Sequence, residues 1–168
     1  NRLADPRDYL EYVHNLPLED YLRPDEGLRA VLQALPQRRI IFTNSNRGHA
    51  ERVLEVLGVR DQIDQIIDIV ALDFCNKPKP ESYLLALAAA GGVSPASCVI
   101  ADDMLRNLLP AATLGMMTVH VVEREDPALS PDLRIRDIKE LPAALPALLD
   151  GRSRISSAGP PHSGSRRG

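Results

Sequence analysis

Three groups of polar residues in this chain have the types and the order needed to bind a phosphoryl group and a divalent cation. They are Thr43 with Asn44, then Lys77, and then the adjacent pair Asp102 and Asp103. The first group supplies a hydroxyl and backbone donors, the second a cation, and the third two carboxylates. Donors and a lysine can neutralise the nonbridging oxygens of a phosphoryl group, and Mg²⁺ prefers carboxylate oxygens together with water. The pattern therefore indicates phosphoryl chemistry with Mg²⁺ as the implied cofactor.

Each group also has a simpler structural interpretation. The hydroxyl and amide of the first group could do no more than cap the helix that follows them. The lysine, with a second lysine two residues on, could be a solvated surface charge. The two acids could cap a helix, although adjacent like charges raise one another's pKa unless a cation compensates them. The order and spacing of all three groups, rather than any one of them, favour the functional interpretation.

The segments around these groups predict strands that alternate with helices. Apolar runs of strand length lie at 39–43, 66–70, 98–101, 117–122 and 133–135, and helical patterns lie at 24–35, 50–57, 80–90, 105–114 and 138–149. Pro110 falls inside one predicted helix and would kink it unless it lies in the first turn. Alternation of this kind predicts an α/β fold with a mainly parallel sheet, because parallel neighbours need crossover connections. Ligands bind beyond the carboxyl ends of such strands, where the three groups stand.

The composition of the chain limits which classes of partner and which cellular locations we expect. No apolar run in the 168 residues approaches the ~20 that a bilayer span requires, and a formal net charge of −3 gives no general field to hold nucleic acid. We therefore expect a small phosphomonoester as partner, with neither nucleic acid nor membrane. Cys75 and Cys98 are far apart and lack metal-ligand spacing, which favours a reducing cytoplasmic or nuclear location. The Gly, Ser, Pro and Arg composition of residues 151–168 predicts a disordered tail.

Three segments resemble the haloacid-dehalogenase superfamily and, within it, the pyrimidine 5'-nucleotidase-like branch. They are IIFTNSNRGHAERVLEVLGV at 40–59, NKPKPESYLLALAAAGG at 76–92 and CVIADDMLRNLLPAATLGMMTVHV at 98–121, and the preceding LPLEDYLRPDEGLRAVLQALP at 16–36 is also similar to that branch. The resemblance covers about residues 9–149. It implies a helical-cap remnant at 1–22 and a Rossmann-like α/β core at 23–150, before the tail.

The resemblance also implies a role for each site residue. Thr43 would hydrogen-bond the transferring phosphoryl group, helped by the backbone of Asn44, and Lys77 would pair with the phosphoryl oxygens and with the nucleophile. The acidic residues would serve the metal: Asp102 as a direct Mg²⁺ ligand and Asp103 as a ligand through water or as an orienting group. The family's DDxxxN pattern ends here at position 107, and this asparagine, Asn107, would brace the metal loop.

One motif of the superfamily is absent from the chain. The family's first strand ends in DxDxT, whose first aspartate attacks phosphorus and whose second acts as general acid and base, and these 168 residues contain no such segment. Asp5 and Asp8 do not follow an apolar strand and cannot substitute. The gap lies where an N-terminal truncation would put it. We therefore expect the chain as given to be inactive and to lack a central strand, so that the neighbouring strands have unpaired backbone groups.

The leading functional expectation is a Mg²⁺-dependent parent enzyme that hydrolyses nucleoside monophosphates through an aspartyl-phosphate. Two alternatives remain open at this point. The chain could be a noncatalytic domain that binds phosphate-bearing ligands or a protein partner, or it could belong to another phosphatase or a sugar-phosphate mutase of the same superfamily. The DDxxxN pattern disfavours a dehalogenase, which needs no metal.

Overall fold

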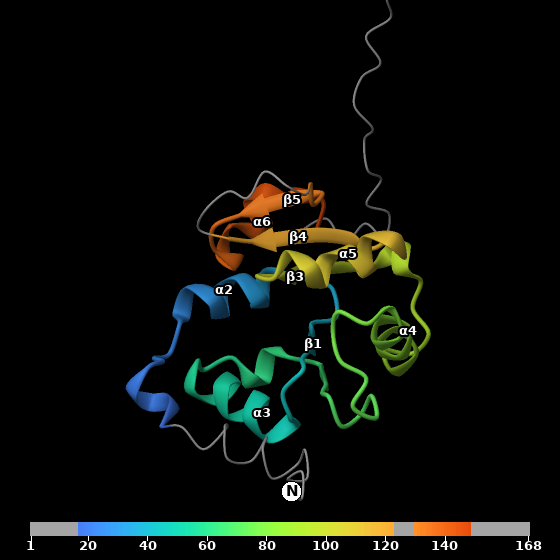
Figure 1. The fold of residues 1–168 in the computed structure, drawn as a ribbon. Helices are drawn as coiled ribbons and strands as arrows, with labels where there is room; N and C mark the ends of the chain where they lie inside the picture. The colour runs from blue at the N-terminus through green and yellow to red at the C-terminus, as the bar shows by residue number, and fades with distance from the viewer. Residues whose placement is uncertain (1–16, 123–129, 149–168) are drawn as a thin grey trace, which may run out of the picture.

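The strands lie in two separate parallel sheets in the computed structural model, which describes residues 17–122 and 130–148 (Figure 1). The first sheet pairs β1 (Ile40–Phe42) with β2 (Gln65–Ile67). The second has the order β3 (Val99–Asp102), β4 (Met117–Val121) and β5 (Leu133–Ile135). Every pairing is parallel, and helices connect most of the strands, which confirms the predicted α/β fold with a parallel sheet and flanking helices.

The helices begin and end where the sequence supplies caps. They are α2 (Glu26–Ala34), α3 (Arg47–Val56), α4 (Pro80–Ala89), α5 (Leu105–Thr113) and α6 (Leu141–Ala144), with 3-10 turns at 18–20, 60–62, 95–97, 138–140 and 146–148. The side chains of Asp25 and Asn46 each accept a backbone N–H three residues on, at the start of α2 and α3. Gly58 and Gly91 follow α3 and α4 with φ of 71° and 98°, the left-handed conformation that a helix C-cap favours. None of the helices in the described part of the chain is long and apolar enough to cross a membrane.

Three predicted elements differ from the structure. The closing helix predicted at 138–149 is wrong: the described residues there form two 3-10 turns around the four-residue α6. Pro142 and Pro146 cannot donate backbone hydrogen bonds, so no long helix propagates through them. The strand predicted at 66–70 ends at Ile67, and Pro110 is the sixth residue of α5, beyond its first turn.

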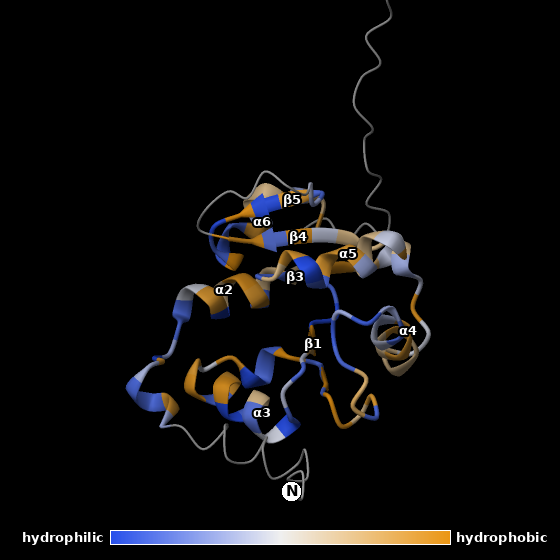
Figure 2. Cartoon of the chain, viewed as in Figure 1, coloured by the Kyte–Doolittle hydropathy of each residue, from blue (hydrophilic) through white to orange (hydrophobic). Residues whose placement is uncertain are grey.

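Each sheet has its own apolar core. The buried residues of α3 pack with the middle of β2, and the buried residues of β4 and β5 pack with α6 and the turn that follows it. Figure 2 shows that α2 and α3 carry both apolar and polar residues, as expected for helices that cover a sheet on one side. The site residues therefore stand at the ends of two separately supported sheets.

The two sheets present open edges to a shared cavity. β1 and β3 each pair on one side only among the described strands. The carbonyl of Arg39 and the N–H of Thr43 bond to β2 or its flank, so the alternate residues Ile40 and Phe42 direct their backbone groups to the other edge. A cavity of about 490 Å³ is lined by side chains from both edge strands. Among the described residues, no strand lies between β1 and β3.

One predicted domain lies partly, and another wholly, outside the described residues. Residues 1–16 of the predicted cap remnant are not described, and the remaining residues, 17–22, include one 3-10 turn at Leu18–Asp20. The predicted tail at 151–168 lies wholly outside the described residues.

Candidate active site

The centre of the site is an ion pair between Lys77 and Asp102. Lys77 comes from the loop before α4, and Asp102 is the last residue of β3. The Nζ and Oδ2 atoms lie 2.7 Å apart, and the two side chains are only 12% and 7% exposed. The same Nζ lies 5.0 Å from the centre of the Phe42 ring, at the end of β1, close enough for a cation–π interaction. The lysine thus bridges the two sheets.

The Asp102 carboxylate is held on both oxygens. Its Oδ1 accepts the N–H of Met104 and the Nδ2 of Asn107, each at 2.9 Å, while Oδ2 accepts from the lysine. Burial works against ionisation of this carboxyl, but the ammonium of Lys77 and the other donors outweigh burial, so the pKa of Asp102 lies below its usual value. An ionised, oriented carboxylate therefore stands at the carboxyl end of β3.

Thr43 and Asn44 stand at the corresponding end of β1. The Thr43 backbone N–H donates to the Ile67 carbonyl at 3.0 Å, and its hydroxyl oxygen accepts the Ser45 N–H at 3.0 Å. The hydroxyl hydrogen is therefore free to donate elsewhere. The side chain of Asn44 reaches Lys77: its Oδ1 accepts the Lys77 N–H at 2.8 Å, and its Nδ2 donates to the Lys77 carbonyl at 3.1 Å. The first two predicted groups are joined by these contacts.

The loop that follows Asp102 and the start of α5 are held by contacts from β4 and α4. Asp103 has an exposed side chain, and its carbonyl lies 3.0 Å from Nε2 of the buried His120 on β4. Asn107 is buried, and its carbonyl accepts the hydroxyl of Tyr83 on α4. Burial, with the charge of Asp102 nearby, raises the pKa of this phenol to about 12, so it stays a neutral donor. The structure thus brings Asn44, Lys77, Asp102 and Asn107 into one chain of hydrogen bonds, with Thr43 and Asp103 beside it.

Sequence reasoning missed two buried polar residues near the site. Asp68, only 5% exposed, accepts the N–H of Arg47 and the N–H of Ala71, and so ties the start of α3 to the end of β2. Asp68 could have been identified from the sequence, because it is an acidic residue directly after an apolar strand, as Asp102 is. His120 lies opposite Asp102 in the strand register. A single histidine within an apolar strand gives no comparable signal.

The donors present fit part of a Mg²⁺ site. Asp102 and Asp103 offer hard oxygen ligands, and Mg²⁺ commonly keeps several waters and takes only one or two carboxylates from a protein. Within residues 17–122 and 130–148, however, no cluster of three or more His, Cys, Asp or Glu side chains is arranged to hold a metal ion. The described residues therefore supply a partial ligand set.

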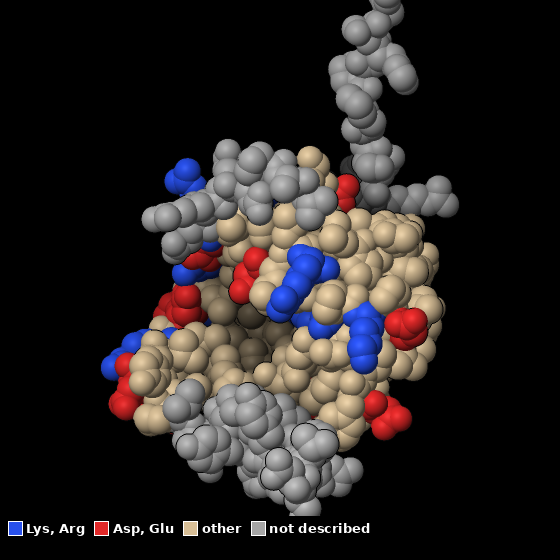
Figure 3. Space-filling view, viewed as in Figure 1, with Lys and Arg blue, Asp and Glu red and all other residues tan. Residues whose placement is uncertain are grey.

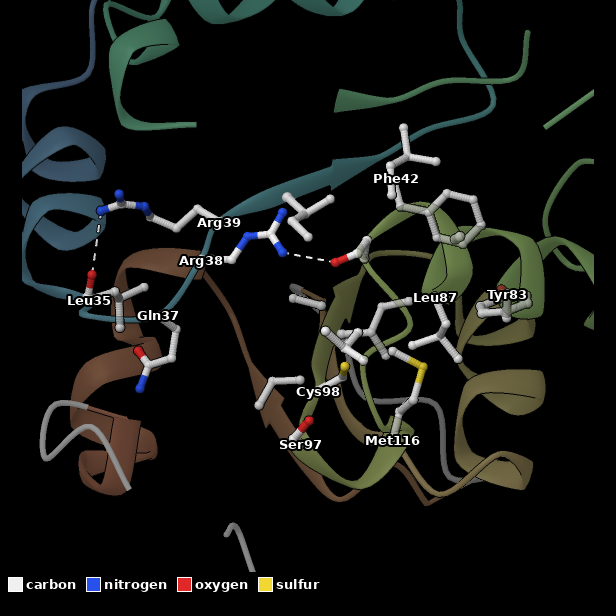
Figure 4. A pocket seen from close by; sticks show the side chains of 18 of the residues that line it. Leu35, Gln37, Arg38, Arg39, Phe42, Tyr83, Leu87, Ser97, Cys98 and Met116 are labelled. Carbon is white, nitrogen blue, oxygen red and sulfur yellow. Dashed lines mark hydrogen bonds between the residues drawn. The ribbon is translucent and has the colours of Figure 1, made fainter. Parts of the chain in front are cut away.

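The cavity between the sheets adjoins this site. Figure 3 shows a hollow between the half that carries β3 to β5 and the half that carries α3, with charged side chains near its rim. Figure 4 shows Phe42, Leu87, Cys98 and Met116 among the residues that line the cavity, where Arg38 donates to the Ala90 carbonyl at 2.8 Å. Phe42, which lines the cavity, also contacts Lys77, so the cavity and the ion pair share a wall.

Comparisons with known proteins identify a family and two curated relatives. The model of the haloacid dehalogenase-like hydrolases matches residues 2–115. The chain is 33% identical over 136 residues to phosphate metabolism protein 8 of Saccharomyces cerevisiae, covering 73% of this chain and 42% of that protein. It is 32% identical over 114 residues to the fructose-1-phosphate phosphatase YqaB of Escherichia coli, covering 67% of this chain and 54% of that protein. The chain thus spans about half the length of these curated relatives.

A solved structure shares the fold. The crystal structure of a conserved haloacid dehalogenase-like protein of Agrobacterium tumefaciens superimposes with a TM-score of 0.66 at 24% identity, covering 84% of this chain and 68% of that one. At this identity the likeness concerns the fold.

Proposed function

Because the chain belongs to the haloacid dehalogenase-like hydrolases, we propose that it forms the phosphoryl-binding half of a phosphomonoester hydrolase. The observation that carries the proposal is the buried Lys77–Asp102 pair, which stands at the carboxyl end of β3 and is bound through Asn44 to the end of β1. Such strand ends are where α/β proteins bind ligands. The pair places a cation and a carboxylate where a charged group can be neutralised and oriented.

Each residue has a distinct task in this proposal. The Thr43 hydroxyl donates to one nonbridging oxygen of the phosphoryl group, and the Lys77 ammonium neutralises another. Asp102 holds the lysine in place, while Asn107 and the Met104 N–H keep the carboxylate oriented. A bound Mg²⁺ would neutralise charge on the transferring group and would take its protein ligands from Asp102 and Asp103.

The nucleophile has to come from residues that the described part of the chain does not show. We propose that a further strand, ending in an aspartate, pairs with β1 and β3 across their shared cavity, because these two edges face the cavity and have no partner among the described strands. Its carboxylate attacks phosphorus, the P–O bond to the leaving alcohol breaks, and that oxygen takes a proton from the second aspartate of the DxDxT motif. Water then attacks the aspartyl-phosphate and releases inorganic phosphate, which restores the carboxylate.

The test extends the chain upstream by an apolar strand that ends in DxDxT. The extended protein should release inorganic phosphate from phosphomonoesters in the presence of Mg²⁺. Changing the first aspartate of the added motif to asparagine should cost on the order of 10⁶ in kcat, and Asp102→Asn should also abolish turnover. The matched control is the chain as given, which should show no turnover. Activity that persists in EDTA would refute the proposed mechanism.

The substrate class is a finer part of the proposal. The resemblance to the pyrimidine 5'-nucleotidase-like branch favours nucleoside monophosphates, whereas the relative in Escherichia coli is named for fructose 1-phosphate. A panel of nucleoside monophosphates and hexose phosphates, assayed by phosphate release with the extended protein, separates the two classes. Isomerised hexose phosphate without phosphate release would instead indicate a mutase.

A second candidate function follows from the absence of DxDxT in the sequence. The chain as given would then bind a phosphate-bearing ligand or a protein partner without turning it over. Calorimetry of the chain with Mg²⁺ and inorganic phosphate tests the ligand part. Binding to the chain together with no turnover by the extended protein would favour this candidate over the enzyme.

A further inference from the structure

The amide of Asn44 makes two hydrogen bonds to the backbone of one residue, Lys77, which is 33 positions away. Its oxygen accepts the Lys77 N–H, and its nitrogen donates to the Lys77 carbonyl. We infer that Asn44 is a positioning residue, whose side chain fixes the backbone from which the phosphoryl-binding lysine projects. This inference rests on the proposed function for the role of the lysine, but the clamp itself is a property of the fold.

The loop that carries Lys77 offers little else to hold it. The residue lies between β2 and α4, outside any helix or strand. Local turns fix the loop on either side, with the Cys75 N–H bonded to Leu72 and the Lys79 N–H bonded to Asn76. In the described part of the chain, the N–H and carbonyl of Lys77 have no hydrogen-bond partner besides Asn44. The amide therefore holds the backbone groups of Lys77 itself, between the two turns.

Fixing the backbone matters because the side chain above it is long. A free lysine loses considerable rotamer freedom when its ammonium is held in one place. Here the Nζ is held between Asp102 at 2.7 Å and the Phe42 ring at 5.0 Å, and the clamp holds the other end. Because Asn44 directly follows Thr43, the clamp also fixes the distance between the hydroxyl and the ammonium. The two groups then meet a phosphoryl group as one preorganised unit.

The chemistry of the clamp requires an amide. Asparagine offers an acceptor and a donor on one short side chain, whereas an ionised aspartate only accepts. Asn44→Asp therefore keeps the bond from the Lys77 N–H and loses the bond to its carbonyl. Asn44→Ala loses both but keeps the Asn44 backbone N–H, which is the group the family resemblance assigns to phosphate. The clamp therefore predicts that phosphate binding weakens more in Asn44→Ala than in Asn44→Asp. This order distinguishes the clamp from direct contact between the amide and the ligand.

The first measurement needs no ligand. Amide hydrogen exchange of Lys77, followed by NMR in the full chain, should accelerate roughly tenfold in Asn44→Ala because the acceptor of that N–H is gone. The matched control is Asn46→Ala, which removes another asparagine two positions on, whose oxygen caps α3 by accepting the His49 N–H at 2.9 Å. That control should leave exchange at Lys77 unchanged. Unaltered exchange in Asn44→Ala would overturn the clamp.

The second measurement asks whether the clamp acts through the lysine. Calorimetry with inorganic phosphate and Mg²⁺ should show at least tenfold weaker binding for Asn44→Ala, since the loss of one hydrogen bond is worth about that factor and this variant loses two. Lys77→Ala should weaken binding at least as much, and adding Asn44→Ala to it should weaken binding no further. Additive losses, or a loss equal to that of Asn46→Ala, would overturn the positioning role.

The two measurements distinguish a failure of the proposed function from a failure of the inference about Asn44. If the unaltered chain binds no phosphate, the proposed function fails, and the exchange of the Lys77 amide still decides whether the clamp exists. If phosphate binds and Asn44→Ala leaves both exchange and affinity unchanged, the proposed function stands and the inference about Asn44 falls.

Discussion

Removing the ammonium of Lys77 should cost the chain about 3 kcal/mol of stability. Lys77→Met keeps most of the aliphatic stem and deletes the charge, which leaves the Asp102 carboxylate 7% exposed and without a cation. Breaking one partner of a buried ion pair typically costs 3–5 kcal/mol. The value here lies at the low end, because Met104 and Asn107 still donate to the carboxylate. The lost contact with the Phe42 ring accounts for about 0.5–1 kcal/mol of this total.

Urea unfolding at pH 7 in EDTA, without phosphate, measures this cost. With a slope of about 2 kcal/mol per molar urea, the midpoint should fall by roughly 1.5 M. The comparison variant is Lys139→Met, whose ammonium lies 2.9 Å from Asp25 and 3.2 Å from Asp137, with the three side chains 38%, 33% and 47% exposed. Exposed pairs contribute about 0.2–1 kcal/mol, so this midpoint should move far less.

A double variant makes the test specific to the pair. Lys77→Met combined with Asp102→Asn removes the stranded charge and should recover much of the lost stability, because a neutral amide is less costly to bury than an unpaired carboxylate. The reasoning is refuted if Lys77→Met moves the midpoint no more than Lys139→Met does. It is equally refuted if the double variant is as unstable as the single one.

Three further changes probe the scaffold. Asp68→Ala should cost about 2–4 kcal/mol in urea unfolding, because it leaves two backbone N–H groups without their acceptor; a cost below 1 kcal/mol would argue against the capping role. A hydrogen bond from Arg29 lowers the pKa of Asp61 to about 2, so the stability this acid contributes is present above about pH 4 and is lost as the pH falls towards 2. Asp61→Asn should reduce the pH dependence of the melting temperature over that range. An unchanged dependence of the melting temperature on pH would contradict the stabilising role of Asp61. Pro110→Ala should raise the melting temperature, because a proline at the sixth position of α5 removes a helical hydrogen bond; a lower melting temperature would show that the ring packs better than alanine.

The strands and most helices could be predicted because local signals and tertiary packing agree in them. β1 and α3 follow from an apolar run, a cap at Asn46 and a glycine at position 58. The same logic fails after Asp137, where apolar spacing suggests a long helix but Pro142 and Pro146 interrupt its hydrogen bonds. Apolar periodicity indicates which residues are buried, but it takes no account of the backbone N–H groups that the two prolines lack.

The residues of the candidate site could be predicted from the sequence, but most of the contacts between them could not. Polar residues at the ends of β1 and β3 predicted which groups could meet, and the structure brings Lys77 to Asp102. The sequence did not indicate that the Asn44 side chain would hold Lys77, because that contact depends on the path of a loop without periodic structure. The burial of His120 beneath Asp103 is equally a product of strand register, which the sequence specifies only weakly for so short a strand.

The open edges of β1 and β3 have a consequence for how this polypeptide behaves at high concentration. Within the part of the chain that the structure describes, two unpaired rows of amides and carbonyls on either side of an apolar hollow offer a template to extended chains that reach them. Identical molecules can supply such chains, so assembly into larger species should grow with protein concentration. A competing strand that fits the hollow should suppress this assembly, which makes light scattering a simple measure of whether the space has been filled.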